Sequence, residues 1–149
     1  MTMKKLCAAF VICSTMTFTS AYAQTVSNEV PMQFGNMVVG GAGTVTVLNT
    51  SDTRNATGAV ALVGSAPVQR ASFDITFTPG SQVVITLPGP TTMAGANTPS
   101  FTPTILGGTT QTIPGGGILT VFLGGTITFT LSGSYGVASV TVPVIVDPL

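Results

Sequence analysis

The alternation of apolar residues with threonine and serine constrains this sequence more than any other feature. In the segment 72–78, Phe73, Ile75 and Phe77 occupy every second position, and polar residues fill the positions between them. This two-residue period is that of a half-buried β-strand. No segment after residue 23 shows a helical period, and glycine or proline interrupts almost every window of ten residues. The sequence therefore predicts an all-β protein.

The same alternation recurs between turn signals along the rest of the chain. The strands expected from it are 44–48, 59–63, 72–78, 83–87, 118–123, 126–131 and 139–146. Pro79-Gly80 predicts a turn that joins two of these strands as a hairpin, because proline and glycine suit the two central turn positions. Gly124-Gly125 predicts a second hairpin between the strands that flank it.

Other segments lead to more specific expectations. The apolar run 118–123 predicts a strand that is covered on both faces. The strand 139–146 places its valines on one side, and Pro143 predicts a free edge there because proline lacks an N–H. The polar segment 49–58 predicts an exposed loop. The segment 88–117 is rich in proline, glycine and threonine, and predicts weak strands joined by loops.

Seven or more short strands separated by turn signals predict a single antiparallel two-sheet β-sandwich of immunoglobulin-like type. A closed barrel fits the same pattern and stays an alternative. No linker divides the chain, so 24–149 is expected to form one domain. High hydrophobicity and a charged fraction of only 5% are the opposite of what disordered chains show.

The first two dozen residues differ from the rest. Two lysines, a mostly apolar stretch at 6–18 and small residues at Ala21 and Ala23 follow one another in the order of a secretory signal peptide. The apolar stretch is shorter than the roughly 20 residues that a membrane-spanning helix needs. We therefore expect a signal peptide over 1–23, cleavage before Gln24, and a mature protein without a transmembrane anchor. Its expected location is periplasmic, cell-surface or extracellular.

The two cysteines, Cys7 and Cys13, both lie in this predicted signal peptide. Leu6 and Ile12 precede them where a lipid anchor requires a small residue, so a lipoprotein is not expected. A mature chain without thiols suits an oxidising compartment. The sequence also has no histidine. Ser-His-Asp triads, Cys-His pairs and ordinary zinc or copper sites are therefore excluded, and no cofactor is expected.

The mature chain carries few charges, and they are scattered. Its charged side chains are Glu29, Asp52, Arg54, Arg70, Asp74 and Asp147. Two cations against four anions leave no basic patch for nucleic acid. A pair of carboxylates could hydrolyse a glycoside, but these four lie in separate segments, so a glycoside hydrolase is a remote alternative and no catalytic residue is assigned. Asp52 and Arg54 share one loop and are expected to form a local ion pair.

Carbohydrate binding is the second interpretation. Modules of that kind stack sugars on aromatic rings, but the sequence has no tryptophan, and Tyr135 is the only tyrosine of the mature chain. Phe101, between Pro99 and Pro103, is the phenylalanine most suited to exposure. Core packing is the more common fate of such a residue.

The order of motifs resembles that of a secreted bacterial family known as domain of unknown function 4402. The matching segments are 32–37 (MQFGNM), 43–47 (GTVTV), 73–77 (FDITF), 83–87 before Pro88, 124–128 (GGTIT) and 133–136 (GSYG). The family typically has a "GGTLTV" phrase and later a "G-x-Y-x-G" turn before its closing strand. The resemblance implies an exported β-sandwich, loosely pilin-like or adhesin-like, and brings no catalytic residues.

The N-terminal part of the mature chain is a candidate for strand exchange between subunits. Its apolar residues stand at even-numbered positions and would face one side of a strand, so the segment could add as a strand to a neighbouring sheet. These residues are Val26, Val30, Met32 and Phe34. The favoured alternative is that it forms the first strand of its own domain. Strand faces with threonine and serine also lack the charges that guard exposed edges. The sequence thus predicts a non-catalytic structural or adhesive protein, a fimbria-like surface or matrix subunit, which associates with itself or with other surface subunits.

Overall fold

The computed structural model describes residues 24–92, 99–130, 133–140 and 142–149, with the backbone alone for 133–139. All regular elements in these ranges are β-strands, which confirms the all-β prediction. The predicted signal peptide lies outside the described residues.

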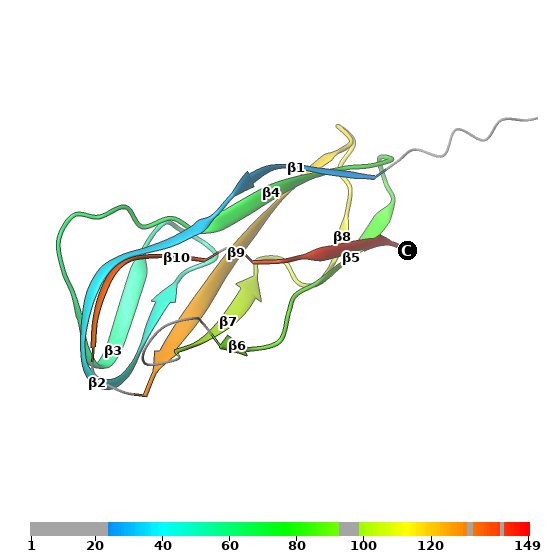
Figure 1. Ribbon diagram of the computed structural model, residues 1–149. Helices are drawn as coiled ribbons and strands as arrows, with labels where there is room; N and C mark the ends of the chain where they lie inside the picture. The colour runs from blue at the N-terminus through cyan, green and yellow to red at the C-terminus, as the bar shows by residue number, and fades with distance from the viewer. Residues whose placement is uncertain (1–23, 93–98, 131–132, 141) are drawn as a thin grey trace, which may run out of the picture.

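The strands form two antiparallel sheets (Figure 1). The larger sheet contains β1 (Thr25–Val30), β2 (Met32–Val47), β3 (Arg54–Leu62), β4 (Ala71–Thr76), β6 (Thr91–Thr92), β7 (Ser100–Ile105), β9 (Ile118–Phe129) and β10 (Gly133–Val140). The smaller sheet contains β5 (Gln82–Thr86), β8 (Thr110–Thr112) and β11 (Ile145–Pro148). No described strand pairs with a strand of the other sheet, so the fold is the predicted two-sheet sandwich and not a closed barrel.

The larger sheet follows the order β1-β4-β9-β2-β10, with β3 on β2, β7 on β9 and β6 on β7. β9 is the central strand, because its first half pairs with β4 and its second half with both β2 and β7. The smaller sheet has the order β11-β5-β8, which leaves β11 with an open outer edge among the described strands. β1 is likewise an edge strand.

The core lies between the sheets and is built by the predicted alternation. In β4, Ala71, Phe73 and Ile75 are buried, while the residues between them face outward. Val83 and Ile85 of β5 approach from the smaller sheet and are fully buried. None of the described polar or charged residues is buried. The interior is therefore a packed apolar layer.

The hairpin predicted at Gly124-Gly125 is wrong, because β9 runs straight through both glycines. A Cβ atom at Gly124 would lie 2.5 Å from the Val47 carbonyl oxygen and 2.5 Å from the Asn49 nitrogen. A Cβ atom at Gly125 would collide with the Phe101 ring. The two glycines thus allow neighbouring parts of the chain to approach β9 closely, which is a common reason for glycine within a strand.

The turn predicted at Pro79-Gly80 is confirmed, but the hairpin around it is wrong. Gly80 has a φ of +82°, and the Ser81 N–H donates to the Thr78 carbonyl at 3.1 Å. The strands on either side, β4 and β5, lie in different sheets. The turn therefore carries the chain across the sandwich, since turn chemistry fixes the change of direction and not the partner of the next strand.

The C-terminal valine segment also crosses between the sheets. Val140, Val142, Val144 and Val146 are half-buried and pack against the core, as predicted for one side of the segment. They do not form one strand, because β10 ends at Val140 in the larger sheet and β11 begins at Ile145 in the smaller one. Pro143 lies exposed in the crossing.

Three further expectations change in detail. The predicted loop 49–58 is shorter, because β3 begins at Arg54 and pairs with β2. The run 118–123 is not covered on both faces, since Ile118 is 52% exposed. The segment 133–136 is part of β10 and not a turn. The expectation of weak strands in 88–117 holds for β6 and β8, which have two and three residues, but not for β7, whose six residues all pair with β9.

Candidate functional site

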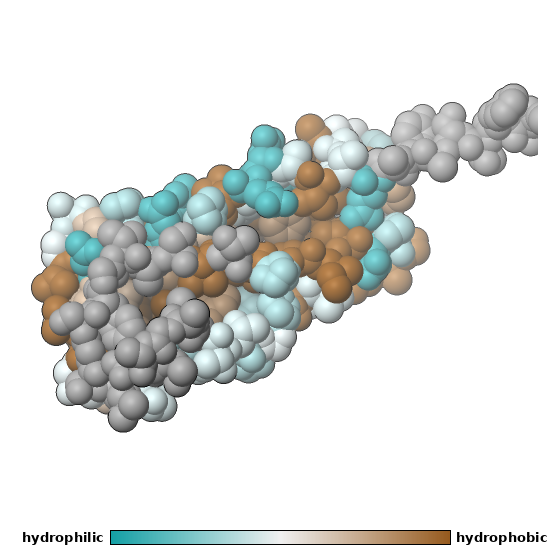
Figure 2. All heavy atoms as spheres, viewed as in Figure 1, coloured by the Kyte–Doolittle hydropathy of each residue, from teal (hydrophilic) through white to brown (hydrophobic). Residues whose placement is uncertain are grey.

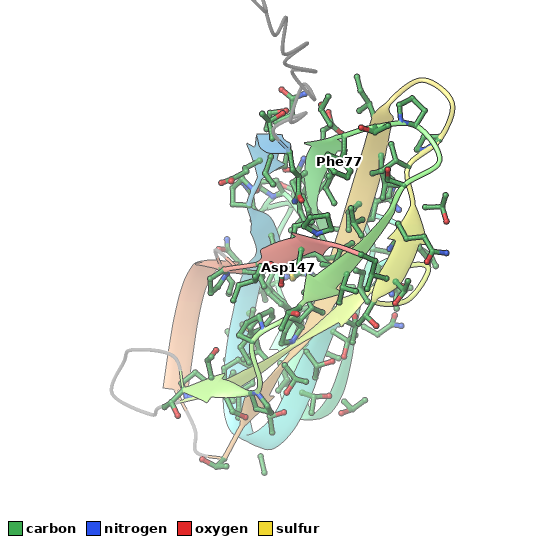
Figure 3. The ribbon with its side chains drawn as sticks, turned by 90° about the vertical axis from the view of Figure 1, so that its right-hand side faces the viewer. Phe77 and Asp147 are labelled. Carbon is green, nitrogen blue, oxygen red and sulfur yellow. The ribbon has the colours of Figure 1, made fainter. Side chains whose placement is uncertain are left out.

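The charged side chains of the described residues do not converge on a reaction centre. Groups of three or more histidine, cysteine, aspartate or glutamate side chains that could hold a metal are absent from the described part of the chain. Asp52 and Asp74 each bind a neighbouring strand or loop, and Asp147 lies on β11, which crosses the middle of the molecule in Figure 3.

The ion pair predicted between Asp52 and Arg54 is wrong, because Asp52 pairs with Arg70. Asp52 Oδ1 lies 3.8 Å from Arg70 Nε and accepts the Arg70 backbone N–H at 3.0 Å. The Arg70 guanidinium carbon also stacks 3.8 Å from the centroid of the Phe122 ring. Phe122 faces outward from β9, and the guanidinium covers its ring, so this aromatic side chain is half-buried.

Arg54 has a structural role inside the larger sheet. Its Nη1 donates to the Phe34 carbonyl and, at 2.9 Å, to the Asn36 carbonyl. These two carbonyls flank Gly35, whose φ of +68° belongs to the left-handed region. A side chain at Gly35 would collide with the guanidinium, since its Cβ would lie 2.7 Å from Nη1. Arg54 and Gly35 therefore form one unit that stabilises an irregular part of β2.

We expect Arg54→Met to lower the free energy of unfolding by about 2 kcal/mol, because two carbonyls lose a charged donor. Urea denaturation followed by circular dichroism measures this change. Arg54→Lys keeps the charge but not the planar guanidinium, so the stability of this variant should fall between those of the wild type and Arg54→Met. A methionine variant as stable as the wild type would contradict this role.

Phe101 does not offer a platform for sugar stacking. Its side chain is 2% exposed, and its ring meets the Phe34 ring edge-to-face with centroids 6.1 Å apart. The ring also fills the space that Gly125 leaves open. The prediction that Phe101 packs in the core is confirmed.

An apolar groove lies beside β1. It has a volume of about 430 Å³ and is lined by Val26, Glu29, Val30, Pro31, Ala71, Ser72, Phe73, Leu123, Val142, Pro143, Val144 and Val146. In Figure 2, hydrophobic residues gather along a band between β1 and β4 on one side and β11 on the other. Phe73 and Leu123, which are almost fully buried, reach the groove from the core. The sandwich is therefore incompletely closed along this side.

A second hollow, of about 460 Å³, lies at the far end of β4. Its lining comes from 76–79 and 116–118, which are the turn after β4 and the start of β9. Figure 3 places Phe77 at this end of the molecule, well separated from Asp147. Ile118 is the most exposed apolar side chain there, but no charged residue accompanies it. The polar side chains of its lining are the two threonines Thr76 and Thr78.

The structure divides the four residues of the predicted exchange segment into two pairs. Met32 and Phe34 are fully buried in β2. Val26 and Val30 belong to β1 and line the groove, and Val26 is 43% exposed. β1 pairs with β4 of its own domain, from Thr25 opposite Thr76 to Val30 opposite Ser72. Exchange of this segment between copies stays a prediction.

A polar bridge on the outer surface attaches β1 to the sheet. The Asp74 carboxylate accepts hydrogen bonds from Asn28 Nδ2 and Thr120 Oγ1, both at 2.7 Å, so that it joins β1, β4 and β9. Asn28 itself sits in an irregular part of β1 with a φ of +53°. The hydrogen bond from Asn28, followed by that from Thr120, holds the pKa of Asp74 below its ordinary value. No pattern in the sequence indicates this bridge, because it depends on the register of three strands.

The bridge predicts a loss of stability in acid. Because the pKa of Asp74 is lower in the folded state, its contribution is complete above the unfolded-state pKa of about 4 and is lost as the pH falls through the folded-state value. Urea midpoints of the wild type should therefore fall more between pH 6 and pH 3 than those of Asp74→Asn. Equal pH dependence of the two proteins would show that the bridge contributes nothing.

In the described part of the chain, no helix has the length and hydropathy needed to cross a membrane. Comparison with curated proteins and with solved structures gives no significant match. The sequence model of one protein family matches residues 24–147, which is nearly the whole predicted mature chain. The chain therefore belongs to the family described as Domain of unknown function (DUF4402).

Proposed function

We propose that this protein is a non-catalytic structural subunit of the bacterial cell surface or extracellular matrix, fimbria-like in its use of β-strand edges. The observation that carries the proposal is the outer edge of β3. This strand pairs with β2 and with no other described strand, so its outer N–H and C=O groups are open to a partner. Proteins usually protect such an edge with charged residues or proline.

β3 has almost none of these protections. Across its nine residues it contains no proline, and its single charged residue, Arg54, is directed to the carbonyls of β2. Exposed apolar side chains, Val38, Leu62 and Val63, surround the far end of the strand. Since Arg54 is directed to β2 and the second half of the strand, 59–62, is apolar, this open edge is suited to pairing with another chain.

The predicted signal peptide supports a role outside the cytoplasm. The predicted cleavage point before Gln24 coincides with the first residue that the family model matches. The carboxylates give no comparable support for hydrolysis. Asp52 and Asp74 are occupied by structural contacts. The other two, Glu29 beside the groove and Asp147 on β11, lie on strands of different sheets. A scaffold therefore fits the described residues better than an enzyme.

Immunogold electron microscopy of intact cells that express the protein tests this proposal. We expect labelled filaments or a labelled surface layer on cells that are not permeabilised. A strain in which the gene is deleted is the control for antibody specificity. Label confined to the periplasm of permeabilised cells, with monodisperse purified protein, would contradict the proposal.

A further inference from the structure

β1 resembles an attached arm more than a part of the core. Residues 25–29 are all exposed, and only Val30 is half-buried. Its two valines face a groove that they do not fill, whereas Met32, two residues beyond Val30, is fully buried. The packed body of the domain therefore begins at Met32, and what precedes it is held by backbone pairing, polar contacts and the two valines beside the groove.

The junction between arm and body is a single proline. Pro31 is the only residue between β1 and β2, and it is exposed. Proline keeps the chain extended and donates no hydrogen bond, so the junction itself makes few demands on its surroundings. The pairing of β1 is also irregular, with a register shift between Ser27 and Val30.

The surface that receives the arm is fully specified by the structure. It consists of the β4 edge from Ser72 to Thr76, the Asp74 carboxylate that binds Asn28, and the apolar groove that accepts Val26 and Val30. The groups that bind these three features are the backbone of β1, the Asn28 amide, and the Val26 and Val30 side chains, and all of them belong to the arm. An identical arm from a second copy can make the same contacts without any new complementarity.

We propose that β1 exchanges between copies of this protein, so that the β4 edge and its groove bind the arm of a neighbouring subunit. The inference rests on the proposed function, because a structural subunit needs a specific joint. Exchange conserves the contacts of the arm, so assembly costs mainly the entropy of association, which high local concentration at a surface reduces. The open edge of β3 remains free for lateral contacts between the joined subunits.

Paired cysteines across the arm and its receiving strand test the exchange. Thr25 and Thr76 are exposed and lie opposite each other in the β1–β4 ladder. The full-length chain carries Thr25→Cys and Thr76→Cys, with Cys7→Ser and Cys13→Ser so that no other thiol is present. Cells that display the protein are oxidised, and the subunits are separated on a denaturing gel without reductant. We expect covalent multimers for the pair and monomers for each single cysteine variant.

The β2–β3 hairpin supplies a matched control. Thr44 and Thr57 are opposed in that ladder, with their hydroxyl oxygens 2.8 Å apart. Cysteines at these two positions should give internally linked monomers only, whether or not the arm exchanges. If the Thr25–Thr76 pair also gives only internally linked monomers, or no disulfide at all, the exchange is refuted. Surface assemblies that persist in that case would leave the proposed function standing, whereas their absence would remove both.

Deletion of residues 25–30 provides a second measurement that does not depend on disulfide formation. Because β1 buries no side chain fully, the truncated protein should still fold, with a thermal midpoint within a few degrees of the wild type. Its multimers should be lost. Truncated protein that assembles like the wild type would overturn the inference.

Discussion

Replacing Phe101 with alanine should lower the free energy of unfolding by about 4 kcal/mol, the effect expected for removal of a buried aromatic ring. The ring is 2% exposed, packs edge-to-face on Phe34, and fills the space above Gly125 in the central strand β9. Alanine would leave a cavity bounded on one side by backbone, and backbone cannot move inward to fill it.

Urea denaturation of Phe101→Ala and of Ile118→Ala measures this effect against a matched control. Ile118 lies on the same strand as Gly125 but is 52% exposed, so its truncation should cost less than about 1 kcal/mol. A cost below about 1 kcal/mol for Phe101→Ala as well would mean that its side chain is not in the core. In that case sugar stacking by Phe101 would return as an interpretation.

Gly124→Ala should destabilise the protein by about 3 kcal/mol, although it adds only one methyl group. The new Cβ would lie 2.5 Å from both the Val47 carbonyl oxygen and the Asn49 nitrogen. Both are backbone atoms, one at the last residue of β2 and the other in the turn that follows it, so no rotation of a side chain can relieve the clash. The separation of β2 and β9 would have to increase, which weakens the ladder that joins Val47 to Gly125.

Gly115→Ala is the control for this substitution. A Cβ atom at Gly115 meets nothing within 4 Å, so its effect should lie within about 0.5 kcal/mol of zero. Thermal melts of the two variants and the wild type separate a local clash from a general effect of replacing glycine. Equal melting temperatures for the two variants would show that β9 does not approach β2 as closely as described.

Alternation in the sequence predicted the faces of the strands well, because side-chain direction in a strand depends on local geometry alone. Phe73 and Ile75 point inward, and Val45 and Val47 do the same in β2. Partners of the strands could not be predicted in this way. Pro79-Gly80 turns the chain in the manner expected, yet it leads to the opposite sheet. Nothing within a few residues of a turn specifies which distant strand will form the next ladder.

The candidate site was predicted only in part, and for the same physical reason. The alternation of apolar residues predicted that Val26 and Val30 face one side of a strand, and both residues line the groove beside β1. The groove itself depends on where the C-terminal segment crosses between sheets. Likewise, Arg54 lies near Asp52 in sequence, but the fold brings Arg70 to that carboxylate and gives Arg54 to the carbonyls of β2.

The mass of the native protein on intact cells tests most directly whether this domain is a scaffold. Cells are sheared mechanically without lysis, and the released material is separated by size and probed for the protein. The account predicts that the protein appears in the sheared fraction at masses many times that of a single mature chain, which is smaller than the 15.0 kDa of the full sequence. Recovery as a single-chain species from the periplasm, with none released by shearing, would contradict it.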